Sequence, residues 1–155
     1  MRFRLELFVE DLDTSVAFYE RALGFRAARH EHEYASLRRG DAELGLAPIT
    51  KLPVGGAGPG FTQERVARDR GAGVEIVLQV EDLAAAADVV ERAGVGLVEP
   101  PRERPWGLRD FRLADPDGYY LRVTTRSPGT SEVSSRPTRP LFPTHGGTSA
   151  SREER

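Results

Sequence analysis

The sequence contains no cysteine, a single methionine and a single tryptophan in 155 residues. The absence of cysteine excludes disulfides, thiolate metal sites and a cysteine nucleophile. No stretch is apolar for long enough to span a bilayer, and Met1–Leu12 alternates charged and apolar residues where a signal peptide would have an apolar block. We therefore expect a cytoplasmic protein without a membrane partner.

The chain has no marked excess of charge of either sign. Lysine and arginine number 22, aspartate and glutamate number 24, and the formal net charge is −2. Without a basic field, nucleic acid is not an expected partner. Hydrophobic residues make up 39% and charged residues 30% of the chain, as is usual for soluble globular proteins. This length suits one compact domain, or two small units that share a core.

Two short sequences occur twice, in the same order, 71 positions apart. Val9-Glu10-Asp11-Leu12 recurs as Val80–Leu83, and Glu20-Arg21-Ala22 recurs as Glu91–Ala93, without a gap between the two matches. A shared order and a shared register indicate an internal duplication, which governs the prediction of the fold.

Each copy begins with a run of alternating residues, at 3–9 and at 74–80. One side of each run is uniformly apolar, which predicts a half-buried strand. A helix follows in each copy, with Asp11 or Asp13 as the cap of the first and Asp82 as the cap of the second. Glycines at 24 and 94 end these helices. Phe18 and Tyr19 sit at helical spacing and are predicted to belong to the core.

Three shorter strands are predicted after each helix, and the turn Asp115-Pro116-Asp117-Gly118 precedes the last of them. Their ranges are 25–32, 33–38, 42–46, 96–99, 109–113 and 119–125. Each copy therefore has the order βαβββ, and the predicted fold class is α+β. We expect a domain over residues 1–126, consisting of module one (1–49), a linker (50–72) with a helical turn at 63–70, and module two (73–126). The tail 127–155 lacks periodicity and is predicted to be disordered.

The first repeat with the following Phe18–Phe25, together with Glu99–Gly107 and Asp115–Tyr119, resembles the vicinal oxygen chelate superfamily. This superfamily includes glyoxalase I, bleomycin-resistance proteins and extradiol dioxygenases. The resemblance covers residues 3–125. It implies two tandem βαβββ modules whose curved sheets enclose a cleft for a small-molecule ligand, commonly in a homodimer.

In metal-dependent members of this superfamily, the resemblance places one ligand on the first strand and one on the last strand of each module. The corresponding residues of this sequence are Arg4, Glu43, Glu75 and Arg122. A guanidinium has no lone pair for a cation, and the two carboxylates that remain are too few for a catalytic metal shell. We therefore predict no metal and no cofactor, and a charge-neutral Arg/Glu quartet in their place. The alternative is that the four are unrelated residues on a wet rim.

Histidine gives a second possible metal site. His30 and His32 point the same way if residues 25–32 form a strand, so a two-histidine site is conceivable. Their charged neighbours favour an exposed, solvated strand instead. His145 lies in the tail and is assigned no role.

Aromatic residues are candidates for lining the cleft. Trp106 lies on a loop, where it could close over a flat, aromatic ligand or could seal the contact between the modules. Phe8, Phe61, Phe111 and Tyr120 are further candidates. The predicted ligand-binding residues are Arg4, Glu6, Phe8, Glu43, Glu75, Trp106, Phe111, Tyr120 and Arg122.

Two functions remain open. One is metal-independent binding of a small molecule, as in the antibiotic-sequestering bleomycin-resistance branch. The other is an enzyme, such as a glyoxalase-like lyase, an isomerase or a natural-product tailoring enzyme. Glu43 or Glu75 would then be the base, and Arg4 or Arg122 would steady an enolate or a carboxylate. A carboxylate clamped by arginine is a weak base, which favours binding.

Overall fold

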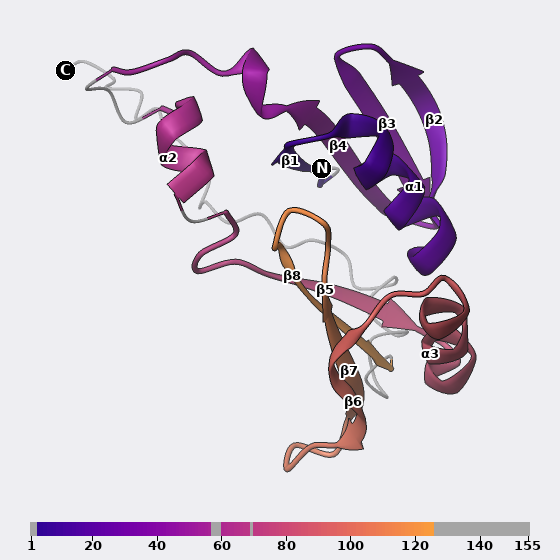
Figure 1. Cartoon of the computed structure of the whole chain (residues 1–155). Helices are drawn as coiled ribbons and strands as arrows, with labels where there is room; N and C mark the ends of the chain where they lie inside the picture. Colours follow the sequence, from indigo (N-terminus) through magenta and orange to yellow (C-terminus); the bar gives the residue numbers. More distant parts are fainter. Residues whose placement is uncertain (1–2, 57–59, 69, 126–155) are drawn as a thin grey trace, which may run out of the picture.

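The computed structural model describes residues 3–56, 60–68 and 70–125, so the predicted tail and His145 lie outside the described part of the chain. The described residues form two βαβββ modules joined by a linker (Figure 1). Module one consists of β1 (Leu5–Val9), α1 (Leu12–Leu23), β2 (Arg26–Glu31), β3 (Tyr34–Arg39) and β4 (Ala42–Pro48). The linker contains a 3-10 turn (Ile49–Lys51) and α2 (Gln63–Arg68). Module two consists of β5 (Glu75–Val80), α3 (Leu83–Arg92), β6 (Leu97–Glu103), β7 (Arg109–Ala114) and β8 (Tyr120–Thr125). The predicted fold class is confirmed.

Both modules have the same sheet topology. The strand orders are β1-β4-β3-β2 and β5-β8-β7-β6. The first strand of each module pairs in parallel with the last, and the other pairings are antiparallel. The first strand of each module is therefore an edge of its sheet. Strand β6 is also an edge, which explains why it runs to Glu103 and not only to the predicted position 99, since an edge strand tolerates Pro100 and Pro101.

The helices begin and end as their local sequences dictate. The Asp11 carboxylate accepts a hydrogen bond from the Thr14 N–H at 2.7 Å, so Asp11 is the cap of α1, and this bond lowers the pKa of Asp11. The Asp82 carboxylate caps α3 in the same way, at 2.9 Å from the Ala85 nitrogen. Gly24 ends α1 with φ 66°, a left-handed conformation that glycine adopts without strain. Within the described residues, no helix is long and apolar enough to cross a membrane.

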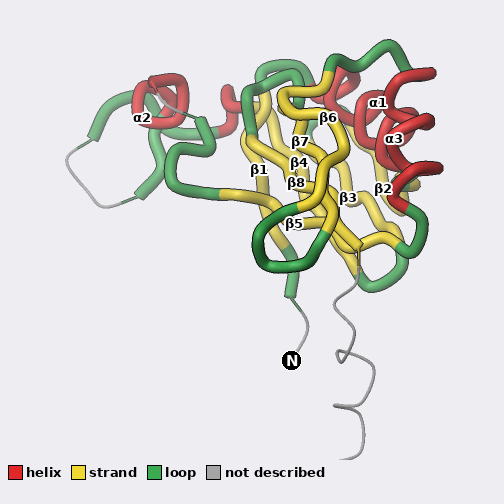
Figure 2. Tube along the Cα trace, turned by 90° about the horizontal axis from the view of Figure 1, so that it is seen from below, coloured by secondary structure: helices red, strands yellow, loops and turns green. Residues whose placement is uncertain are grey.

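A single hydrophobic core serves both modules. Helices α1 and α3 pack against each other and lie side by side along one flank of the two sheets (Figure 2). The predictions for Phe18 and Tyr19 are confirmed, since both side chains are buried in this core. An exposed strand was predicted over residues 25–32. Strand β2, Arg26–Glu31, is exposed throughout, whereas Phe25 before it is buried in the core.

The turn between β7 and β8 locks module two onto module one. The Tyr119 hydroxyl accepts a hydrogen bond from the Phe8 N–H at 3.2 Å and donates one to the Phe8 carbonyl at 3.0 Å. The Asp117 carboxylate accepts from the Glu10 N–H at 2.7 Å and from the Ser15 hydroxyl at 3.0 Å. We call this set of contacts the interlock. It occupies part of the outer edge of β1, which would otherwise be open.

A buried hydrogen bond completes the interlock. The Tyr19 hydroxyl donates to the Asp115 carboxylate at 2.8 Å, and both residues are buried. Burial raises the pKa of Asp115, although the hydrogen bond from Tyr19 opposes that shift. Burial also raises the pKa of Tyr19 well above its usual value, so this phenol remains a donor at neutral pH.

Candidate functional site

Each sheet has one face toward the helices and one face away from them. In β1, Leu7 and Val9 are buried against the core, so the alternation turns Arg4, Glu6 and Phe8 to the other side. We call this side of the first sheet the module-one face. It comprises Arg4, Glu6, Phe8, Tyr34, Ser36, Arg38, Glu43 and Gly45.

Glu6 crosses the middle of the module-one face. Its backbone partner on β4 is Gly45, and a Cβ atom at that glycine would come within 2.6 Å of the Glu6 Oε1 atom. The missing side chain at Gly45 therefore lets the Glu6 carboxylate lie over β4. There it meets the Arg4 guanidinium at 2.5 Å and the Tyr34 hydroxyl, on β3, at 3.4 Å.

Glu43 has partners of its own on β3. The Ser36 hydroxyl donates to it at 3.5 Å, and the Arg38 guanidinium lies 3.4 Å away. Within the described residues, the ion pairs of Arg4 and Glu43 thus remain inside module one. Neither residue pairs with Glu75 or Arg122.

The corresponding side of the second sheet carries a denser network of charges. We call it the module-two face. Arg122 lies 3.2 Å from the Glu75 carboxylate, and Arg112, its direct neighbour on β7, lies 3.9 Å from it. Glu75 therefore sits against two guanidiniums that would otherwise repel each other across the strands. The Arg112 guanidinium also donates to the Tyr120 hydroxyl at 3.2 Å.

A buried ion pair closes one end of the module-two face. The Asp110 carboxylate is 0% exposed and accepts from the Arg104 Nε at 2.7 Å. A second nitrogen of Arg104 donates to Glu99 at 2.5 Å, which lowers the pKa of Glu99. Arg104 belongs to the hairpin between β6 and β7, so this pair holds the hairpin against the sheet. Sequence reasoning missed Arg104, Asp110 and Arg112, although Asp110 and Arg112 alternate with the apolar residues of β7.

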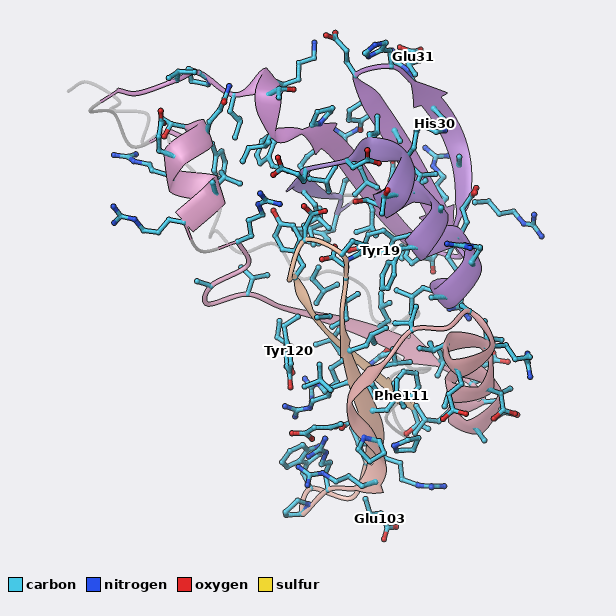
Figure 3. The ribbon with its side chains drawn as sticks, viewed as in Figure 1. Tyr19, His30, Glu31, Glu103, Phe111 and Tyr120 are labelled. Carbon is cyan, nitrogen blue, oxygen red and sulfur yellow. The ribbon has the colours of Figure 1, made fainter. Side chains whose placement is uncertain are left out.

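The same alternation corrects the prediction for Phe111. This residue lies between Asp110 and Arg112, so its ring points to the helix side, where it is 0% exposed. Figure 3 shows Phe111 and Tyr120 on opposite sides of the second sheet. Phe111 is therefore a core residue and does not line the polar face.

Trp106 lies at the tip of the hairpin that Arg104 holds. Its side chain is 56% exposed, so it does not seal the contact between the modules. That alternative is wrong, and the indole is accessible to a ligand.

A hollow of about 460 Å³ adjoins the module-one face at the outer edge of β1. Glu6 and Phe8 line it from β1, Phe61 lines it from the linker, and Val74 and Tyr119 line it from module two. The rings of Phe8 and Phe61 are 5.2 Å apart. We call it the Phe8 pocket. It combines three aromatic side chains with the carboxylate of Glu6 and the guanidiniums of Arg65 and Arg70.

The residues at the metal-ligand positions do not fit a metal ion. Two of the four are arginines, and the Glu75 carboxylate already contacts two guanidiniums. The His30 imidazole faces Asp13 at 2.9 Å on the exposed strand β2, where Figure 3 shows it. Across residues 3–56, 60–68 and 70–125, no three or more histidine, aspartate or glutamate side chains are grouped as a metal site. A catalytic metal needs three or four such ligands.

Comparison with known proteins settles the family. The family model described as the glyoxalase/bleomycin resistance protein/dioxygenase superfamily matches residues 3–123. The chain belongs to this superfamily. Comparison with the curated proteins found no match.

Several solved structures are similar to the chain. The bleomycin resistance determinant encoded on the transposon Tn5 has a TM-score of 0.60 and 25% identity, over 82% of this chain and 98% of that one. TioX from Micromonospora sp. ML1 has a TM-score of 0.65 and 23% identity, over 82% and 99%. A glyoxalase-related enzyme from Fulvimarina pelagi has a TM-score of 0.60 and 19% identity, over 81% and 88%. The last two similarities support the fold alone.

Proposed function

We propose that this superfamily member binds a small molecule without a metal ion, and that it sequesters its ligand as an antibiotic-resistance protein does. The ion pair between Glu75 and Arg122, with Arg112 beside it, is the observation that carries this proposal. The resemblance places Glu75 and Arg122 where metal-dependent relatives hold ligands, and here the two residues pair with each other. Charged groups held close together in this way can bind polar groups of a ligand through charge-assisted hydrogen bonds.

The surroundings of the faces suit a ligand with an aromatic part and polar groups. The Phe8 pocket has a volume of about 460 Å³, which lies in the range of small-molecule sites. Phe8 and Phe61 offer ring contacts, and Glu6 offers a carboxylate at the same place. Exposed Trp106 adds a further flat surface at the end of the module-two face.

We also propose a homodimer. Within the described residues, no ion pair joins the module-one face to the module-two face, and each face is open on its outer side. A second copy could place its module-one face against the module-two face of the first, and the predicted quartet would then form between chains.

The test is ligand binding by the full chain with and without chelator. We expect a panel of aromatic antibiotics, bleomycin among them, to raise the melting temperature and to quench the fluorescence of Trp106, equally in the presence of EDTA. Arg122→Gln should weaken that binding at least tenfold, whereas Glu81→Gln, at an exposed site beyond β5, should leave it unchanged.

Two results would contradict the proposal. One is a stoichiometric metal ion, measured by mass spectrometry of the purified protein, whose removal abolishes binding. The other is turnover of a bound compound that Glu75→Gln abolishes while the fold is intact, since that result supports the enzyme alternative.

A further inference from the structure

The two modules differ in the turn that precedes their last strand, which in module two forms the interlock. Five residues, 115–119, connect β7 to β8, whereas only two residues, 40–41, connect β3 to β4. The longer turn contacts Phe8, Glu10 and Ser15 of module one. At the repeat spacing of 71, these positions correspond to Gln79, Glu81 and Ala86 of module two. Gly40 and Asp41 of the shorter turn lie near these positions, but within the described residues their side chains and backbone make no such hydrogen bond to them.

A hollow of about 730 Å³ lies at this place in module two. Gln79, Glu81 and Ala86 line it, together with Phe25, Arg39 and Asp41 of module one. In the described part of the chain, no side chain hydrogen-bonds to the backbone of Gln79 or Glu81, whereas Phe8 and Glu10 each have such a partner. We call this cavity the α3 hollow. The α3 hollow thus lies in module two at the positions that correspond to the interlock in module one, and no residues like 115–119 fill it.

The chemistry of the α3 hollow restricts its occupant. Leu78 on β5 and Ala85, Ala86 and Val89 on α3 form an apolar wall. The lining also carries three carboxylates, of Asp41 from module one and of Glu81 and Asp82 from module two, against one guanidinium, of Arg39. An occupant with a short apolar segment next to a positive charge would match both features.

The described chain ends beside this hollow. Thr125, the last residue of β8, pairs with Val80, which lines the hollow, so the chain leaves about 5 Å from its wall. Residues 126–155 follow. They contain the segment Arg139-Pro140-Leu141-Phe142-Pro143, the only place in the tail where two large apolar residues adjoin, with an arginine just before them.

We propose that the segment Arg139–Pro143 docks in the α3 hollow, with Leu141 and Phe142 against α3 and Arg139 toward Asp41 and Glu81. Thirteen residues, 126–138, separate Thr125 from Arg139, and a connection of that length spans about 20 Å if it behaves as a flexible coil. The effective concentration of a segment tethered at that range is on the order of millimolar, so even a weak site is occupied.

The two prolines, Pro140 and Pro143, restrict the backbone of the segment and so reduce the conformational entropy that is lost on docking. This docking is independent of the ligand on the polar faces.

Hydrogen exchange of the full chain, followed by mass spectrometry, tests this docking. In the wild type we expect the amides of 141–142 to exchange about fivefold more slowly than in a free peptide of residues 136–146, which corresponds to about 80% occupancy. Ala85→Arg puts a bulky cation into the hollow and should abolish the slowing. Ala84→Arg is the matched control, because Ala84 is exposed on the same helix but does not line the hollow.

Hydrogen exchange at the residues that line the hollow provides a second measurement. The amides of Gln79 and Glu81 should exchange faster in Leu141→Ser/Phe142→Ser than in the wild type, and Val133→Ser, elsewhere in the tail, should not change them. Free-peptide exchange rates at 141–142 in the wild type would overturn the docking. A second result would also overturn the docking. If the amide of Gln79 still exchanges slowly in Leu141→Ser/Phe142→Ser, and exchanges more slowly still at higher protein concentration, the hollow is occupied by a second copy of the chain.

Discussion

Tyr19→Phe removes one hydroxyl from the centre of the interlock and leaves a buried carboxylate with fewer donors. The Asp115 carboxylate accepts from Tyr19 at 2.8 Å and from the backbone N–H groups of Asp117 and Tyr119 at 3.0 and 2.9 Å. A hydrogen bond to a charged group contributes about 1.5–3 kcal/mol to stability. We therefore expect the free energy of unfolding at pH 7 to fall by about 2 kcal/mol. With a typical urea dependence of about 2 kcal/mol per molar, the midpoint should fall by about 1 M.

The pH dependence of this loss follows from the carboxyl group. Burial raises the pKa of Asp115 in the folded state, and loss of the Tyr19 donor should raise it further. Because the folded-state pKa of Asp115 is raised above its unfolded value, ionised Asp115 lowers the free energy of unfolding when the pH is above the folded-state pKa. This loss of stability shrinks as the pH falls through the folded-state pKa toward the unfolded value. The deficit of Tyr19→Phe should therefore be largest at pH 7 and smaller near pH 4.

Urea titrations at both pH values, followed by far-UV circular dichroism, measure this deficit. Tyr34→Phe is the matched control, because its hydroxyl contacts Glu6 on an exposed face at 3.4 Å and should change the midpoint little. An equal deficit for Tyr19→Phe at the two pH values, or a midpoint equal to that of the wild type, would refute the role assigned to Asp115.

Two further substitutions probe the polar faces. Gly45→Ala should push the Glu6 carboxylate off β4 and break its contact with Tyr34, at a cost in stability of less than about 1 kcal/mol because Glu6 is exposed enough to move. The cost, measured by urea titration, should vanish in a Glu6→Ala background, and an undiminished cost there would contradict the steric explanation. Asp110→Asn should weaken the buried pair with Arg104 and loosen the hairpin, which acrylamide quenching of the single tryptophan measures directly. Glu103→Gln, on the exposed end of β6, serves as its control, and equal quenching in the two variants would show that Asp110 does not hold the hairpin.

The elements were predictable because their causes are local. Alternation in residues 3–9 predicts β1, and the capping aspartates and the terminal glycine fix the limits of α1. The repeat then transfers the same description to module two. The exceptions are small, such as the longer β6, whose prolines are tolerated only because the strand lies at an edge.

The site was less predictable because its contacts depend on strand order. The sequence places Glu75 and Arg122 on the first and last strands of module two, and these strands are neighbours, so the two residues meet. It does not show that Glu6 reaches across Gly45 to Tyr34, since that contact requires β1, β4 and β3 to lie in this order. Phe111 was predicted to line the cleft, but it alternates with Asp110 and Arg112 along β7 and therefore faces the core.

The two modules are not interchangeable, although they share one ancestry of sequence. The connector that holds them together, residues 115–119, is carried by module two alone. Module one made as a separate protein would present an uncovered β1 edge and is expected to self-associate. A chain built from two copies of module two would instead carry the connector twice. Each connector would then face Ala86 and Val90 in place of Ser15 and Tyr19, so it would lose the hydroxyl partners of Asp117 and Asp115. A symmetric scaffold from half of the natural sequence would therefore need Ala86→Ser and Val90→Tyr.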